Sequence, residues 1–186
     1  MTLENPYGVM KAGLGDEEAI FSTLCRLHEE NGMWPMNPEK VRNEIILSTR
    51  GGSIGSIIGL IKGKTGTIEG IVWLLLSDTW YTDWVSFNER LLYVVPEFRR
   101  STHAKRLVQF AKWCSDQVTD KLPKGPGQQD EIPLLIGINT FKALEPKMRL
   151  YQRQFQQIGA LFSYRLVPTT LGPYNQRHIE PPSKHN

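Results

Sequence analysis

The sequence lacks several features that would restrict its class. It has only two cysteines, Cys25 and Cys114, among 186 residues, which is too few for a disulfide framework. Its longest apolar run, Gly70–Leu76, is far shorter than the roughly 20 residues that span a bilayer. The first fifteen residues contain no basic segment followed by an apolar one, so no signal peptide is predicted. We therefore expect a soluble protein of a reducing compartment, the cytoplasm.

A large excess of charge of either sign is also missing. The chain has 22 lysines and arginines against 19 acidic residues, a net charge of +3. This balance permits an anionic ligand or a nucleic acid but requires neither. Hydrophobic residues make up 40% and charged residues 22%, as in folded globular domains. The basic residues gather locally, because five lie within eight positions: Arg99, Arg100, His103, Lys105 and Arg106.

Hydrophobic periodicity predicts an alternation of helices and strands. We expect helices over residues 16–32, from residue 37, over 101–122 and over 145–157. We expect strands over residues 53–62, 67–76, 86–95, 134–138 and 160–166, the run at 134–138 being central and covered on both faces. Asp16 and Asn37 are expected as helix caps. The order predicts an α/β protein with a mixed sheet and helices on both faces, in one domain of residues 1–167. Residues 168–186 form a polar, proline-rich tail.

The string Gly63-Lys64-Thr65-Gly66 invites comparison with a nucleotide-binding P-loop. That motif requires a glycine five residues before the Gly-Lys pair, and position 58 is Ile58. A strand rather than a helix is predicted to follow. We therefore interpret these four residues as the turn of a β-hairpin.

The segment VVPEFRRSTHAKRL, residues 94–107, concentrates the chemistry. A strand ends at Pro96, and small polar and basic residues lead directly into a long helix. The first turn of a helix presents unbonded N–H groups with partial positive charge, which bind phosphate. Ser101 or Thr102 can cap this helix, while Arg99, Arg100 and Lys105 add full charges. The alternative is a solvated basic helix start without a ligand.

These residues resemble the acetyl-CoA motif of the GNAT acyltransferase superfamily. In that family a strand ending in V-x-P-E-[YF]-R runs into [QR]-x-x-G-x-[GA]; Val94, Pro96, Glu97, Phe98, Arg99 and Ala104 match it. Thr102 departs from it, standing where the family usually has glycine, so its Cβ narrows the loop. The R-R-S-x-x-A-K form is most similar to GNAT-like proteins encoded by bacteriophages. The similarity runs over most of residues 16–166.

The resemblance implies a mostly antiparallel sheet in which a central pair of parallel strands splays apart. It implies acetyl-CoA as acyl donor, with no metal. The pantetheine arm would contact the strand end, and backbone N–H groups would hold the pyrophosphate. The residues implied are Tyr93, Val94, Val95, Arg99, Arg100, Ser101, Thr102, His103, Ala104, Lys105 and Asn139. The side chain of His103 is expected to point to solvent, and Asn139 is equally suited to capping the next turn.

Two residues are candidates for acid–base catalysis. Tyr151 lies where the family commonly has a tyrosine near the CoA sulfur, and a phenol can protonate a thiolate. Its alternative role is packing within an amphipathic helix. Glu89 is the acidic residue inside the predicted strand 86–95, which in the family borders the acceptor site. It would act as the base; the alternative is an exposed strand residue without a catalytic role. Asp83, within the aromatic segment Trp80–Trp84, is a rival base.

The resemblance implies an N-acetyltransferase that moves an acetyl group to a primary amine by direct attack in a ternary complex. The alternative is a catalytically weak or inactive protein of this fold that binds a partner, a host protein in the host cytoplasm if the chain is phage-encoded. A nucleic-acid binder is less well supported, because no alternation of aromatic and basic residues runs along a strand.

Overall fold

A computed structural model describes residues 5–32, 35–51, 55–79, 82–123, 125, 128–137 and 144–157. The predicted strand at 160–166, the tail at 168–186 and Asn139 lie outside these residues. The chain divides into two compact units, Met1–Ile138 and Asn139–Asn186, which we describe separately.

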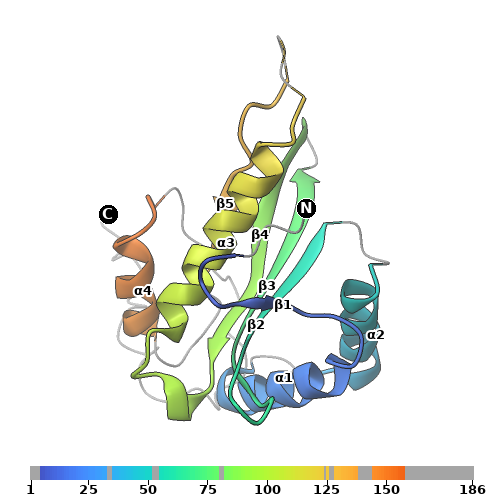
Figure 1. Cartoon of the computed structure of the whole chain (residues 1–186), viewed down its shortest axis with the longest axis vertical. Coiled ribbons are helices and arrows are strands. Elements are labelled where there is room, and N and C mark those ends of the chain that lie inside the picture. Colours follow the sequence, from blue (N-terminus) through green and yellow to red (C-terminus); the bar gives the residue numbers. More distant parts are fainter. Residues whose placement is uncertain are drawn as a thin grey trace, which may run out of the picture. The chain divides into compact units, whose positions relative to one another are not determined.

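The first unit is built on a single mixed sheet (Figure 1). Its strands are β1 (Met10–Lys11), β2 (Ser56–Lys62), β3 (Ile68–Thr79), β4 (Thr82–Val94) and β5 (Leu134–Leu135). They lie in the order β1-β2-β3-β4-β5, with antiparallel neighbours except for the parallel pair β4–β5. The turn at Gly63–Gly66 joins β2 to β3, and Gly66 has a φ of +81°. This confirms the predicted fold class and the hairpin.

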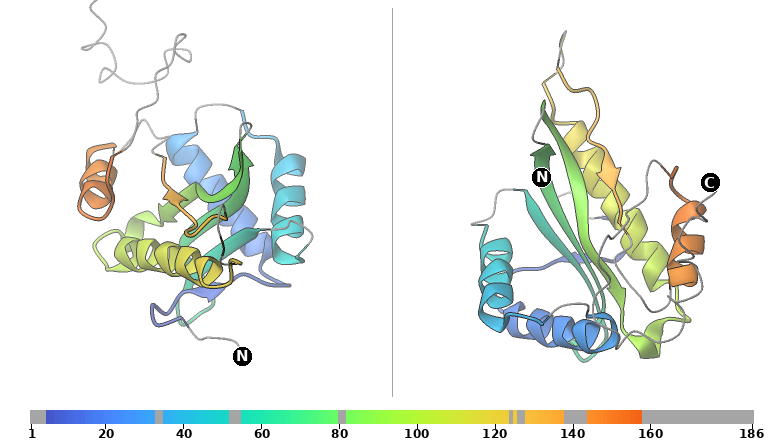
Figure 2. Two further views of the ribbon diagram at one scale, coloured as in Figure 1. Left: turned by 90° about the horizontal axis from the view of Figure 1, so that it is seen from above. Right: turned by 180° about the vertical axis from the view of Figure 1, so that it is seen from behind.

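Helices cover both faces of the sheet (Figure 2). Helices α1 (Glu17–Asn31) and α2 (Pro38–Thr49) pack on one face, where Ile20, Leu24 and Ile45 join a buried cluster with β-strand side chains. A 3-10 turn, η1 (Pro96–Phe98), leads from β4 into α3 (His103–Thr119). Helix α3 packs on the other face, where Phe110 meets the backbone at Gly59 and Leu107 meets it at Gly70. The second unit contains α4 (Leu144–Gln152).

Most predicted elements are confirmed, with local differences. Asn37 caps α2 by accepting a hydrogen bond from the Lys40 N–H at 3.0 Å. Asp16 holds the predicted N-cap position of α1, but its side chain makes no cap bond. Its carboxylate instead accepts from the Gly13 N–H and pairs with Lys62. β1 was not predicted, since two residues carry no periodicity. β5 is shorter than predicted, and its two residues are half-buried rather than covered on both faces. Among the described strands it pairs with β4 alone, so it lies at the end of the sheet and not at its centre.

A bulge in β4 sets which side chains face which helices. Trp73 of β3 pairs with Leu91, but Leu74 pairs with Glu89, so Arg90 is an extra residue in β4. Paired residues of an antiparallel ladder share a face. Asn88 therefore lies on the α1/α2 face, opposite Leu75, and Glu89 lies on the α3 face, opposite Leu74.

No helix among the described residues is both long enough and apolar enough to cross a membrane.

Candidate functional site

Among the described residues, one edge of β4 is left open beside the basic residues of segment 99–106. β4 pairs with β5 only through Phe87–Leu134 and Asn88–Leu135. From Glu89 to Val94 no strand of the described chain pairs with this edge. The Val95 N–H donates to the Glu69 carbonyl of β3 at 3.0 Å. Because the N–H and C=O groups of successive residues point to opposite sides of a strand, those of Tyr93 and Val95 point towards β3. Those of Leu92 and Val94 point towards the open edge.

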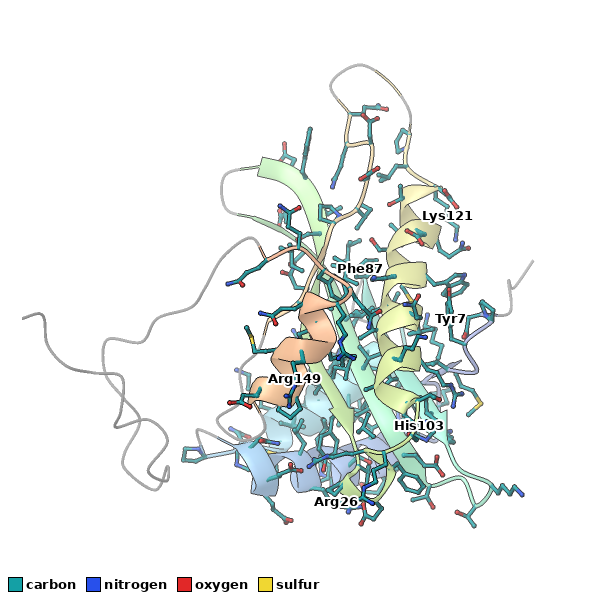
Figure 3. The ribbon with its side chains drawn as sticks, turned by 90° about the vertical axis from the view of Figure 1, so that its left-hand side faces the viewer. Tyr7, Arg26, Phe87, His103, Lys121 and Arg149 are labelled. Atoms are coloured by element: carbon teal, nitrogen blue, oxygen red, sulfur yellow. The ribbon has the colours of Figure 1, made fainter. Side chains whose placement is uncertain are left out.

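The loop that follows this edge, Arg99–Lys105, is called the basic loop below. Two of its N–H groups are used internally: the Ser101 N–H donates to the Phe98 carbonyl at 3.0 Å, and the His103 N–H donates to Ser101 Oγ at 3.1 Å. The N–H groups of Arg100, Thr102, Ala104 and Lys105 meet no acceptor within the described chain. They stand at the N-terminus of the 17-residue helix α3, whose dipole favours an anion there. His103 marks this end in Figure 3.

The basic side chains of this region fall into two groups. Arg100 and Lys105 are exposed and form no ion pair with any described residue. Arg106 is structural, because it donates to the backbone carbonyls of Tyr7 at 2.8 Å and Gly8 at 2.7 Å. Figure 3 shows Tyr7 beside α3 accordingly. Arg100 and Lys105 are therefore the residues whose full charge is available to a ligand.

Arg99 is held by α1 and β4. Its Nη2 pairs with the Glu30 carboxylate at 2.5 Å, and its Nε donates to the Val94 carbonyl at 3.2 Å. The Tyr93 hydroxyl donates to the same carboxylate at 3.3 Å. Burial by itself raises the pKa of Glu30, but the hydrogen bond and charge of Arg99 outweigh it and hold that pKa below its usual value. The sequence did not indicate Glu30, whose spacing is that of an ordinary helix residue.

The expectation that His103 points to solvent is wrong. Its side chain is 12% exposed, and its Nε2 lies 2.7 Å from a carboxylate oxygen of Glu69 in β3. The ring also stacks on Phe98, with centroids 5.9 Å apart. The side chain of His103 therefore anchors the start of α3 to the sheet.

Thr102 holds the N-cap position of α3, but the side-chain cap bond comes from Ser101. The Ser101 hydroxyl accepts from the His103 N–H and donates to the Phe98 carbonyl at 2.6 Å, whereas Thr102 makes no side-chain cap bond. Thr102 has φ −84° and ψ 4°, which any L-residue adopts. A glycine is thus not needed for the backbone shape here, and the threonine is no source of strain.

The catalytic candidates are distributed over both units. Glu89 is half-buried on the α3 face of β4, immediately after the last β4–β5 pair. Asp83 is exposed. Tyr151 belongs to α4 of the second unit, where its ring meets Phe155 edge-on with centroids 6.0 Å apart. Asn139 is outside the described residues. The described donor-site candidates therefore lie at the end of β4 and in the basic loop. The placement of Tyr151 relative to them stays a prediction.

Among the residues described, no group of three or more His, Cys, Asp or Glu side chains is arranged to hold a metal ion.

Comparison with solved structures finds this fold in acetyltransferases. A structure described as a probable acetyltransferase has a TM-score of 0.62 at 18% identity, covering 85% of this chain and 95% of that one. A GNAT family acetyltransferase from Staphylococcus aureus gives 0.55 at 15% identity, covering 85% and 97%. AAC(6')-Iy in complex with the bisubstrate analog CoA-S-monomethyl-acetylneamine gives 0.59 at 12% identity, covering 84% and 95%. At sequence identities this low, the structural similarity shows a common fold alone.

Neither protein-family models nor curated protein sequences gave a match.

Proposed function

We propose that this protein transfers an acetyl group from acetyl-CoA to a primary amine. The observation that carries the proposal is the basic loop at the end of the open strand edge. Four of its N–H groups and two of its cations have no partner among the described residues. This arrangement fits a ligand with an anionic diphosphate at one end and an amide-containing arm at the other. The fold shared with acetyltransferases, one of them complexed with a CoA-containing analog, supports the same ligand.

The donor would be held by groups of three kinds. The N–H groups of Arg100, Thr102, Ala104 and Lys105 would bind the pyrophosphate, with the charges of Arg100 and Lys105 beside it. The backbone groups of Leu92 and Val94 would pair with the amides of the arm, as an added strand does. Ser101 and His103 would hold the shape of the loop by their hydrogen bonds. Arg99 would act indirectly, through its hydrogen bond to the Val94 carbonyl. Asn139 remains a candidate for the same arm.

The transfer would proceed by direct attack of an unprotonated amine on the thioester carbonyl. The carbon–sulfur bond breaks as the carbon–nitrogen bond forms, so the ammonium proton has to leave and the thiolate has to be protonated. Glu89, at the point where β4 and β5 part, would take the first proton through a water molecule. Tyr151 would supply the second proton, or a hydrogen bond, to the thiolate.

Release of free CoA in the presence of an amine tests this proposal. Tyr151→Phe removes one hydroxyl and keeps the ring, so we expect the turnover number to fall roughly 10–1,000-fold with acetyl-CoA affinity nearly unchanged. Glu89→Gln should lower the rate chiefly at neutral and lower pH, where the amine is protonated and a base is needed. An unchanged rate in both variants would remove these two residues from the mechanism.

A second function rests on one observation about the open edge. The Val94 carbonyl already accepts a hydrogen bond from Arg99, so one of the groups offered to the arm is occupied. This favours a protein that keeps the fold and uses its surface against a partner, a host protein if the chain comes from a phage. Binding of acetyl-CoA without acetylation of any amine in a broad panel would support this second function.

A further inference from the structure

A second polar site lies on the α1/α2 face of the sheet, at the point where β4 and β5 part. It consists of Ser77 in β3 and of Ser86 and Asn88 in β4, and we call it the serine–asparagine cluster. Ser77 and Ser86 are directly opposite each other in the ladder, and Asn88 is the last β4 residue that pairs with β5. Side chains at these positions share one face of the sheet.

Hydrogen bonds fix the orientation of the Asn88 amide. Its nitrogen donates to Ser77 Oγ at 2.9 Å, to Ser86 Oγ at 3.1 Å and to the Ser86 carbonyl at 3.2 Å. A backbone carbonyl can only accept, so the amide nitrogen must lie on that side. The side-chain oxygen Oδ1 of Asn88 therefore points the other way, and it meets no donor among the described residues.

The cluster thus offers a ligand two complementary groups. Asn88 Oδ1 is an acceptor whose position is fixed by the hydrogen bonds that the nitrogen of the same amide donates. The hydroxyl of Ser77 is used as an acceptor by Asn88, and its proton meets no acceptor in the described chain. Both side chains are half-buried. A half-buried polar group without a partner gains most from a ligand that satisfies it.

The neighbouring charges are already neutralised. Arg90, the bulge residue on this face, pairs with Glu44 of α2 at 2.6 Å, and its guanidinium lies 5.3 Å from the ring centre of Trp73. Deeper in the same face, Trp73 Nε1 donates to Ser56 Oγ at 2.9 Å, and Ser56 bonds to Ser48 at 2.7 Å. These groups are satisfied among themselves. The cluster would therefore recognise a ligand through hydrogen bonds between neutral groups. It offers no free carboxylate to a polycation, because Glu44 already pairs with Arg90.

Resting on the acetyl-transfer function above, we propose that the serine–asparagine cluster binds the acceptor, and that the acceptor is an amine with an adjacent hydroxyl or ether oxygen, such as an amino alcohol or amino sugar. The amine N–H donates to Asn88 Oδ1, and the adjacent oxygen accepts from the Ser77 hydroxyl. The acceptor then approaches the thioester from the α1/α2 face. Glu89 lies on the opposite face of β4, so the water molecule that carries the amine proton to Glu89 would stand in the gap where β4 and β5 part.

A matched pair of amines tests the proposal: trans-2-aminocyclohexanol and cyclohexylamine, each compared per unprotonated amine. We expect wild-type kcat/KM to be about 10-fold higher for the amino alcohol. Ser77→Ala should reduce this preference to about 2-fold, because it removes only the hydroxyl donor. Asn88→Leu, a near-isostere, should raise the KM of both amines about 10-fold. In both variants the affinity for acetyl-CoA, measured by calorimetry, should stay within twofold. Thr67→Ala, which removes an exposed hydroxyl immediately before β3, should change nothing.

Three results would overturn the inference. The first is equal kcat/KM for the two amines in the wild type. The second is a preference that survives Ser77→Ala, which separates this test from any folding defect of Asn88→Leu. The third is weaker acetyl-CoA binding in either variant, which would assign the cluster to the donor. If the wild type binds acetyl-CoA but acetylates neither these amines nor others, the transfer function itself fails, and the inference with it.

Discussion

Glu30 of α1 and Arg99 of the basic loop form an ion pair with 22% and 41% of their side chains exposed. The pair joins the first helix to the loop that follows β4, sixty-nine positions later in the chain. A second pair, Arg26–Glu97, spans the same two segments at 2.7 Å. The α1/α2 layer and the proposed donor site are therefore linked directly, and the stability of one affects the other.

Glu30→Gln is expected to lower the free energy of unfolding at pH 7 by at most about 1 kcal/mol, since solvent screens the exposed Arg99. Because the pKa of Glu30 is lowered in the folded state, its contribution is present above its unfolded pKa and is lost as pH falls through the folded value. Urea unfolding of wild type and variant should therefore differ at pH 7 and converge below about pH 4. Glu97→Gln serves for comparison and should have the smaller effect on stability, because the Arg26–Glu97 pair is more exposed than the Arg99–Glu30 pair. If the difference in unfolding free energy between the wild type and Glu30→Gln grew as the pH fell, the ion pair of Glu30 with Arg99 would be contradicted.

Ser101→Ala should destabilise the protein by about 1 kcal/mol, because Ser101 Oγ accepts the hydrogen bond of the His103 N–H at the start of α3. Thr102→Gly should cost only a few tenths of a kcal/mol and leave acetyl-CoA affinity equal or higher, since Thr102 makes no cap bond. Thermal unfolding and calorimetric titration of both variants check this. Loss of binding in Thr102→Gly would show that the threonine hydroxyl is itself a ligand.

Gly59→Ala should destabilise the fold by about 1–3 kcal/mol, because a Cβ there would lie 2.5 Å from the Phe110 ring and 3.0 Å from Val72 Cγ1. Gly13→Ala is the control, since its Cβ would meet nothing within 4 Å. In a double-mutant cycle, Phe110→Leu should absorb part of the cost of Gly59→Ala. Strict additivity of the two changes would mean that α3 does not pack on β2 as described.

Cys114 should resist alkylation in the native state. Burial raises the pKa of its thiol to about 12, against a smaller opposing effect of Lys11, so almost no thiolate exists at pH 8. Cys25 is only half-buried and should react faster. Mass spectrometry after a timed iodoacetamide pulse distinguishes the two, with urea-unfolded protein as the control in which both react. Equal native rates would contradict the burial of α3 against the sheet.

The sequence predicted the elements with strong periodicity and failed where long-range pairing decides. The helices, the β2–β3 hairpin and the basic loop follow from local residues, such as Asn37-Pro38 and the run from Val94 to Leu107. The bulge at Arg90 depends on the ladder with β3, so the opposite faces of Asn88 and Glu89 could not be predicted. The partners of Arg99 and His103 lie on α1 and β3, far away in sequence, and no local signal marks Glu30 or Glu69.

Calorimetric titration of acetyl-CoA into the wild type and into Arg100→Glu/Lys105→Glu is the most direct test of the basic loop as the donor site. We expect wild-type binding to weaken at least tenfold in the double variant, because two attractive charges beside the diphosphate become repulsive and each charge-assisted bond contributes about 1.5–3 kcal/mol. Lys40→Glu/Lys64→Glu makes the same change of charge elsewhere and should bind like the wild type. Equal affinity of a folded Arg100→Glu/Lys105→Glu protein and the wild type at moderate salt would contradict the account.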